Sequence, residues 1–286
     1  ARGMHCTVLS ANTIDRRTKQ PLFAPSKIIV RDGVRIAFFG ITTPETANKT
    51  SPRNVKDIVF TDAIAAAREQ VRVLRPQADL LIGIMHVGLD KSSVVTSDAI
   101  ARAGPGIDVI MDGHSDTEVP DGLLVGSTLS AQTGCYDHRL GRVDLTVQDK
   151  KVTAKTAHLY TPAELTAIAP QPDAAITARI SQMKTANQAL FAEVIAHSNL
   201  PLSGERALVR TRETALGDLS ADALRAAAQA DIAIVNGGSI RTDLKAGAVT
   251  RLDMMSIFPF GNTLKKVEVS GAVLQSILEH SVSQLP

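Results

Sequence analysis

The sequence predicts an α/β protein that begins with strand–helix–strand units and continues into a second α/β region. Three apolar stretches rich in β-branched residues, 33–42, 78–88 and 106–113, are typical of strands buried on both faces. Residues 62–76 carry apolar side chains at helical spacing and end in a proline. Strand, helix and strand in this order indicate a parallel sheet, whose ligand site lies beyond the carboxyl ends of the strands.

Length and composition limit the class of protein. With 286 residues, 44% of them hydrophobic, the chain can bury sizeable cores, and its length favours two domains. The 31 basic and 29 acidic residues nearly cancel, so we expect no nucleic acid and no lipid surface as the main partner. No apolar run reaches the roughly 18 residues that span a membrane, and the first residues lack the layout of a signal peptide. Cys6 and Cys135 are too few for a disulfide framework and favour burial as small apolar side chains.

A connector is predicted in the middle of the chain. Residues 140–160 read as two strands joined by a hairpin turn at QDKK, and Pro170 and Pro172 follow them. Next comes a long helical pattern with an apolar stripe. The stripe is formed by Ile176, Ile180, Met183, Leu190 and Val194.

We therefore divide the chain into residues 1–165, a connector helix region 166–197, and residues 198–286. In the last part the pattern predicts a helix over 215–230, a strand within 231–238, and a closing helix after Ser270. That closing helix has its own apolar face. The face comprises Val273, Leu274, Ile277, Leu278 and Val282.

Two imidazoles are expected to share one edge of the first sheet. His86 closes the strand of residues 78–88, and His114 follows the strand of residues 106–113 in a turn with Asp116. These side chains suit a metal site or a catalytic acid–base pair, because zinc, manganese and similar ions take imidazole and carboxylate ligands. The alternative for each histidine is a hydrogen-bonded structural residue at a strand end.

The second region offers groups that suit an anionic, planar ligand. Arg206, Arg210 and Arg212 precede its first predicted helix, and Arg241 follows the NGGS turn, so several guanidinium groups could grip an anion in bidentate fashion. A solvated charged face is the alternative for these arginines. Phe260 is held on a turn, where its ring could stack on a planar base, whereas Phe258 is expected in the core.

The chain resembles the 5'-nucleotidase family of metallophosphoesterases, which includes periplasmic UDP-sugar hydrolases. The resemblance covers nearly the whole chain and rests on eight matches in the same order. They are VLSANT (8–13), IAFFGITTPET (36–46), ADLLIGIMHVG (78–88), DVIMDGHSDT (108–117), LGRVDLTV (140–147), VRTRETALGDLSADALR (209–225), IVNGGSIRTDLKAGAVT (234–250) and SIFPFGNTLKKVEVSGAVLQSILEHSV (256–282).

This resemblance implies a fold and a set of site residues. The fold would be a partial metallophosphoesterase sandwich joined by a helix to a partial C-terminal nucleotide-binding domain. His86 and His114 match family metal ligands, while Asp116 stands where relatives carry a ligating His or Gln. The substrate side of the family's site would fall on the second region. Its residues here are Arg206, Arg210, Asn236, Arg241, Phe260 and Asn262.

The resemblance also implies that some of the family's site lies outside this chain. The family's DxHG-type and GNHE-type motifs, which carry further ligands and the catalytic histidine, do not occur before Val8. We therefore expect the chain to be an interior fragment, inactive alone, whose catalytic histidine lies upstream of Ala1. His5 is not in a matching context and receives no role.

The implied activity is hydrolysis of nucleotide phosphate esters or anhydrides, with two divalent ions such as Zn, Mn or Co in the full-length protein. The substrate would be a nucleotide or a nucleotide sugar, and the location periplasmic or extracellular. Because the two groups of residues fall on regions joined by a helix, a closing motion about that helix is expected. Two alternatives remain open: a non-catalytic nucleotide-binding protein, and a 2',3'-cyclic-nucleotide phosphodiesterase with 3'-nucleotidase activity.

Overall fold

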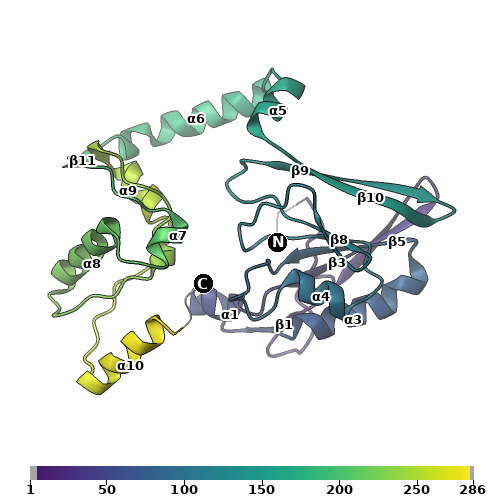
Figure 1. Cartoon of the computed structure of the whole chain (residues 1–286), viewed down its shortest axis with the longest axis horizontal. Helices are drawn as coiled ribbons and strands as arrows, with labels where there is room; N and C mark the ends of the chain where they lie inside the picture. Colours follow the sequence, from purple (N-terminus) through teal and green to yellow (C-terminus); the bar gives the residue numbers. More distant parts are fainter. Residues whose placement is uncertain (1–4, 284–286) are drawn as a thin grey trace. The chain divides into compact units, whose positions relative to one another are not determined.

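The computed structural model describes residues 5–283, except for the side chains of residues 189 and 190. Its contacts divide the chain into two compact units, Ala1–Gln171 and Pro172–Pro286 (Figure 1). The expected division at 1–165, 166–197 and 198–286 stays a prediction. In the described part of the chain, no helix is long and apolar enough to cross a membrane.

A six-stranded sheet forms the centre of unit 1, with strand order β2-β3-β5-β6-β8-β7. Strands β3, β5, β6 and β8 run parallel, and the edge strands β2 and β7 are antiparallel to their neighbours. This confirms the parallel sheet expected from the buried apolar stretches. The strands are β2 (Ser26–Arg31), β3 (Val34–Thr42), β5 (Leu80–His86), β6 (Val109–Met111), β7 (Leu123–Val125) and β8 (Thr128–Ala131).

Two helices cover one face of this sheet, α3 (Ala63–Leu74) and α4 (Ser97–Ala103). Helix α3 begins where the Asp62 carboxylate accepts the backbone N–H of Ala65, which satisfies one of the unpaired donors of the first turn. Phe39 is fully buried in the core between sheet and helices. Truncating a buried phenylalanine to alanine typically costs about 3–5 kcal/mol, so this layer is a main source of stability.

A long hairpin covers the other face of the sheet. Strands β9 (Leu140–Gln148) and β10 (Lys151–Tyr160) are joined at Asp149 and Lys150, both with positive φ, which confirms the expected turn. Val143, Leu145 and Val152 of the hairpin pack on the buried side chains of β5 and β6. The sheet is thus covered on both faces, as its apolar strands require.

Shorter elements complete unit 1. Strand β1 pairs with β4, and the 3₁₀ turn η1 ends α3 at Pro76. The remaining elements are β1 (Thr13–Asp15), α1 (Thr46–Lys49), α2 (Pro52–Val55), β4 (Ile58–Phe60), η1 (Arg75–Gln77) and α5 (Pro162–Ile168).

Unit 2 packs several helices on a two-stranded sheet of β11 and β12. Its buried cluster includes Leu216, Leu244 and Ile257, with Phe258 packed against it as expected. Ser270 caps the last helix through the N–H of Val273, also as expected. The elements are α6 (Ala174–Phe191), β11 (Val194–Ser198), α7 (Arg206–Val209), α8 (Ala215–Ala228), η2 (Gly237–Ser239), β12 (Gly247–Thr250), α9 (Arg251–Ile257) and α10 (Gly271–Ser281).

Two expectations for unit 2 are wrong. The connector helix does not reach Val194, which instead begins β11 and pairs with Thr250 of β12; the Leu190 side chain of the expected stripe lies outside the described residues. Residues 231–236 form no strand, and Ile232 and Ile234 are each 54% exposed. A strand needs a neighbour to receive its backbone hydrogen bonds, and the described chain pairs none with this segment.

The cysteines also differ from the expectation. Cys6 is exposed and Cys135 partly buried, and no disulfide bond joins the two. Burial as a small apolar side chain is therefore wrong for Cys6.

Candidate functional site

The parallel order of β5 and β6 brings two histidines together in unit 1. His86 is the last residue of β5, and His114 follows β6 in the next turn. Their rings meet edge to face, with centroids 5.0 Å apart and planes 62° apart. Neighbouring parallel strands end at the same edge of a sheet, so the strand order itself creates this imidazole pair.

The turn that carries His114 has an unusual backbone. His114 has a φ of 93° and Asp116 a φ of 57°, in the region that favours glycine. Such conformations cost roughly 1–3 kcal/mol each and persist where the surroundings impose them. Gln132 is the main restraint: its side-chain oxygen accepts the Ser115 hydroxyl at 2.8 Å and the backbone N–H of Thr117 at 2.7 Å. Only 2% of Gln132 is exposed, so these bonds are shielded from water.

Asp112 fixes the segment that follows His86. Its carboxylate accepts the backbone N–H groups of Val87 and Gly88, each at 2.9 Å, and the Gln132 amide at 3.3 Å. Gly88 has a φ of 85°, and a Cβ built there would lie 2.9 Å from the Cβ of Ser115. A glycine is therefore required for the two histidine-bearing segments to approach each other.

Glu45 contacts His114 from the loop before α1. Its Oε2 lies 3.2 Å from Nε2 of His114 and 3.1 Å from Nζ of Lys49. Burial raises the pKa of Glu45, but the hydrogen bonds with Lys49 and His114 outweigh that effect and hold the pKa below its usual value. An ionised carboxylate on one ring nitrogen orients the imidazole and leaves the other nitrogen for a ligand.

Glu45, Asp112 and Gln132 were not predicted from the sequence as site residues. Asp112 and Glu45 both lie within motifs quoted for the family resemblance, and a carboxylate directly after a buried strand is the signal that could have identified Asp112. Gln132 directly follows the neighbouring strand β8 and carries no such local signal.

The pKa of His86 lies below its usual value. Partial burial of the ring is the largest cause, and the charge of His114 adds to it, while Asp112 and Asp116 oppose the shift. The shift favours the neutral form of His86, which is the form that binds metal ions.

The imidazole pair fits part of a metal site. Two imidazole donors suit zinc, manganese and similar ions. Yet within residues 5–283 no group of three or more His, Cys, Asp or Glu side chains is placed to hold an ion. Asp116 follows His114 by two residues, and the role expected for it as a ligand stays a prediction.

A second cluster surrounds the glycine turn η2 in unit 2. The Asn236 side chain accepts the backbone N–H of Gly238 at 3.1 Å and so begins the turn. A Cβ on Gly237 would overlap the Val209 carbonyl oxygen, and one on Gly238 would lie 3.3 Å from Nη2 of Arg210. The two glycines thus allow the turn to approach the end of α7 and the Arg210 guanidinium.

Arg241 and Phe260 complete this cluster. The guanidinium carbon of Arg241 lies 5.8 Å from the centroid of the Phe260 ring, within cation–π range, and Nη1 donates to the Gly238 carbonyl at 3.4 Å. Half of Phe260 (51%) is exposed. Arg206 at the start of α7 and Asn262 beyond Phe260 are exposed, and their part in the site stays a prediction.

The chain is similar to known proteins over both units. Residues 194–286 match the model of the family "5'-nucleotidase, C-terminal domain". The chain is 33% identical over 265 residues to the trifunctional nucleotide phosphoesterase protein YfkN of Bacillus subtilis, covering 89% of this chain and 17% of that protein. It is 28% identical over 319 residues to a 5'-nucleotidase of Vibrio cholerae, covering 96% and 56%.

Among solved structures, the 5'-nucleotidase precursor of Thermus thermophilus matches with a TM-score of 0.80 at 27% identity, over 99% of this chain and 59% of that one. The chain thus spans little more than half of the 5'-nucleotidases it matches. The likeness extends through both units and includes the domain model in the second. Residues 194–286 thus belong to the family of 5'-nucleotidase C-terminal domains, and the chain as a whole is similar to 5'-nucleotidases.

Proposed function

We propose that the protein hydrolyses phosphate esters or anhydrides of nucleotides with the help of divalent metal ions. The observation that carries this proposal is the presence, in one chain, of an imidazole pair at a sheet edge and of two arginines with an exposed phenylalanine around a glycine turn. The relatives named nucleotide phosphoesterase and 5'-nucleotidase support it.

In unit 1, His86 and His114 would bind metal through ring nitrogens, with Asp116 as a further ligand and other ligands beyond the described residues. Bound ions of the Zn, Mn or Co type would supply Lewis acidity to the phosphoryl oxygens and lower the pKa of a water nucleophile. Glu45 would fix the ring of His114, and Asp112 and Gln132 would hold the two segments in register. No catalytic acid or base is assigned within this chain.

In unit 2, Arg210 and Arg241 would bind the anionic part of the substrate through bidentate hydrogen bonds. The exposed ring of Phe260 would stack on the base, an interaction worth about 1–3 kcal/mol. Asn236, Asn262 and Arg206 would add polar contacts. A nucleotide or nucleotide sugar offers both the charge and the planar base that this arrangement suits.

The test is release of phosphate from a panel of nucleotides by the natural full-length protein, loaded with manganese, zinc or cobalt. His114→Ala should abolish release, whereas His158→Ala, which removes an exposed histidine that contacts Glu164 and the Tyr160 ring, should retain it. Metal-dependent turnover that survives His114→Ala would refute the proposal.

Asp116 favours one other function. Relatives with a neutral ligand at this position have a metal site with less negative charge, so Asp116 changes the charge of the site. The second candidate is therefore a protein that binds nucleotides without turnover. Calorimetry that detects nucleotide binding in the absence of metal, together with no turnover at any metal loading, would select it. Release of 3'-phosphates or opening of 2',3'-cyclic nucleotides would instead indicate the phosphodiesterase relative of the family.

We also propose a periplasmic or extracellular location, as the family resemblance implies. Fractionation of the source cells, followed by detection of the protein, tests this directly.

A further inference from the structure

We propose that unit 1 binds the phosphate backbone of a nucleic acid strand through a surface that we call the basic face. It lies on the turn after β1 and on the segment from α2 to β4. Its residues are Arg16, Arg17, Lys19, Arg53 and Lys56, all exposed.

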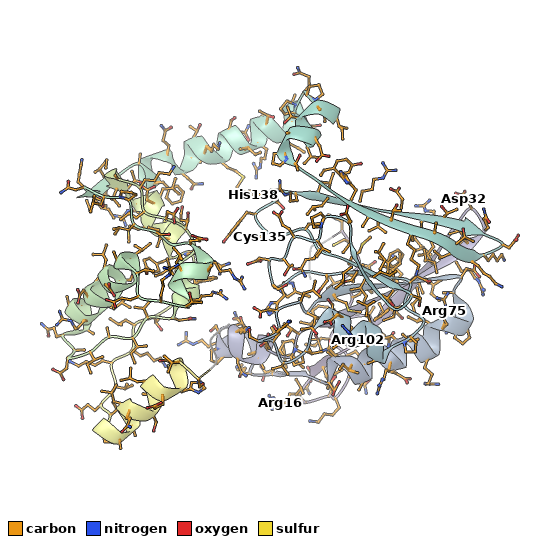
Figure 2. All side chains as sticks on the ribbon, in the orientation of Figure 1. Arg16, Asp32, Arg75, Arg102, Cys135 and His138 are labelled. Atoms are coloured by element: carbon orange, nitrogen blue, oxygen red, sulfur yellow. The ribbon has the colours of Figure 1, made fainter. Side chains whose placement is uncertain are left out.

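The two segments of the basic face are held side by side. Strand β1 pairs with β4 in antiparallel register. The guanidinium of Arg16 donates to the carbonyl oxygens of Lys56 at 3.1 Å and Ile58 at 3.2 Å, and its backbone N–H donates to Asp57 at 2.8 Å. Arg16 lies at the margin of unit 1 (Figure 2). The surface is therefore built on fixed backbone rather than on a loose loop.

Charge is concentrated on this face. Residues 15–20 and 52–57 contain five basic side chains against Asp15 and Asp57, a net charge of +3 that exceeds the +2 of the whole chain. The carboxylate of Asp15 accepts the N–H groups of Arg17 and Thr18, so it is committed to the turn. Although the net charge of the whole chain is close to zero, this face has a local excess of positive charge, which attracts polyanions.

The chemistry of the face favours nucleic acid over a lipid surface. Its uncharged residues include Thr18, Gln20 and Asn54, which offer hydrogen bonds, and residues 15–20 and 52–57 contribute no exposed large apolar side chain. Binding at a membrane interface relies on such side chains for insertion. The same two segments contain no aromatic residue to stack on bases, so the contact would be with phosphates and independent of sequence.

The face lies beside the candidate site of unit 1. Helix α1 contacts both α2 and β4, and its Lys49 pairs with Glu45, which contacts His114. A strand held on the basic face that continues across α1 would extend toward the imidazole pair. That such a strand is hydrolysed there rests on the proposed function, whereas binding to the face does not.

Binding is tested by fluorescence anisotropy with a labelled oligothymidylate of about 12 nucleotides, without added metal so that no hydrolysis occurs. The face variant replaces four basic residues but keeps Arg16, because its guanidinium bonds the backbone. It is Arg17→Gln/Lys19→Gln/Arg53→Gln/Lys56→Gln. The control removes the same charge from exposed positions elsewhere in unit 1, as Arg31→Gln/Lys91→Gln/Lys150→Gln/Lys151→Gln.

We expect the face variant to bind at least about 10-fold more weakly than the wild type. The affinity of the control should be much closer to that of the wild type. Counterion release contributes a slope of about 0.7 per phosphate contact for single strands, so the salt dependence of the affinity should fall by up to about 3 in the face variant. A mixed-sequence strand of equal length should behave like oligothymidylate.

Equal weakening in both variants, or an unchanged face variant, would overturn the proposal. Binding to vesicles with anionic phospholipid but not to the oligonucleotide would also overturn it and point to a lipid partner. Release of phosphate from a mononucleotide separates this proposal from the proposed function. The face variant should retain that release, and a protein that shows face-dependent strand binding without any release would refute the proposed function alone.

Discussion

The side-chain oxygen of Gln132 accepts the backbone N–H of Thr117 at 2.7 Å and holds the turn of His114 from the end of the neighbouring strand. The same amide donates to Asp112, which holds the segment after His86. One buried side chain thus connects the two segments that carry the imidazoles.

Gln132→Ala should destabilise unit 1 by about 1–3 kcal/mol, because it leaves the Thr117 N–H and the Ser115 hydroxyl without this acceptor in a buried place. Urea unfolding followed by circular dichroism measures the change. Gln20→Ala, at an exposed position, should stay within about 0.5 kcal/mol of the wild type. A Gln132→Ala variant as stable as this control would show that the network does not restrain the turn.

Gly88→Ala and Gly126→Ala form a matched pair. Both glycines have positive φ, 85° and 59°, so both substitutions introduce backbone strain. Only at Gly88 would the new Cβ also press on Ser115, whereas Gly126 has open space. We expect Gly88→Ala to lower the melting temperature more than Gly126→Ala. Equal decreases in melting temperature would mean that the structure accommodates the new Cβ near Ser115 without further loss of stability.

Stability should depend on pH through Asp79. The hydrogen bond from the Arg35 side chain, with another from the Arg35 backbone, lowers the pKa of Asp79 from 3.8 to about 2. A carboxyl whose pKa is lowered on folding stabilises the folded state above its unfolded pKa, and this contribution is lost as pH falls toward 2.

Asp79→Asn should therefore destabilise the protein at pH 7, and the difference from the wild type should shrink between about pH 4 and pH 2. Urea midpoints at pH 7, 5 and 3 measure it, with Asp121→Asn at an exposed position as control. A difference that is the same at all three pH values would contradict the assignment to the Arg35–Asp79 pair.

Phe260→Ala should reduce the affinity of unit 2 for adenosine 5'-monophosphate by about 10-fold, since loss of one stacking contact costs about 1–3 kcal/mol and 1.4 kcal/mol is tenfold. Affinity for ribose 5-phosphate, which lacks a base, should not change. Calorimetry without metal measures both ligands, and Leu264→Ala, half exposed nearby in sequence, serves as control. Equal losses for the two ligands would exclude stacking on Phe260.

The elements that the sequence predicted are those with local signals. The α3 helix carries an Asp62 cap and an apolar face, and the buried strands of the sheet are continuous apolar runs. Residues 231–236 show where local signals fail: the segment has the composition of a strand, but strand formation depends on a partner elsewhere in the chain. Val194 shows the reverse case, because pairing with Thr250 ends a helical pattern early.

The candidate site divides in the same way. His86 and His114 were predictable because each lies at or just beyond the end of a buried strand, and neighbouring parallel strands end at the same edge of the sheet. Gln132 and Glu45 were not, because their roles arise from contacts between segments that are distant in sequence. Such contacts cannot be inferred from the spacing of residues along the chain.

The positive φ values of His114 and Asp116 also restrict how this turn can evolve. Glycine and asparagine relieve or tolerate the left-handed backbone, whereas valine, isoleucine and threonine are disfavoured by their branched Cβ. A mutational library at the two positions should thus return small or amide side chains among folded variants, even under selection for stability alone. Few substitutions could therefore introduce a new metal ligand at either position. For Asp116, asparagine is the polar substitution that causes the least backbone strain.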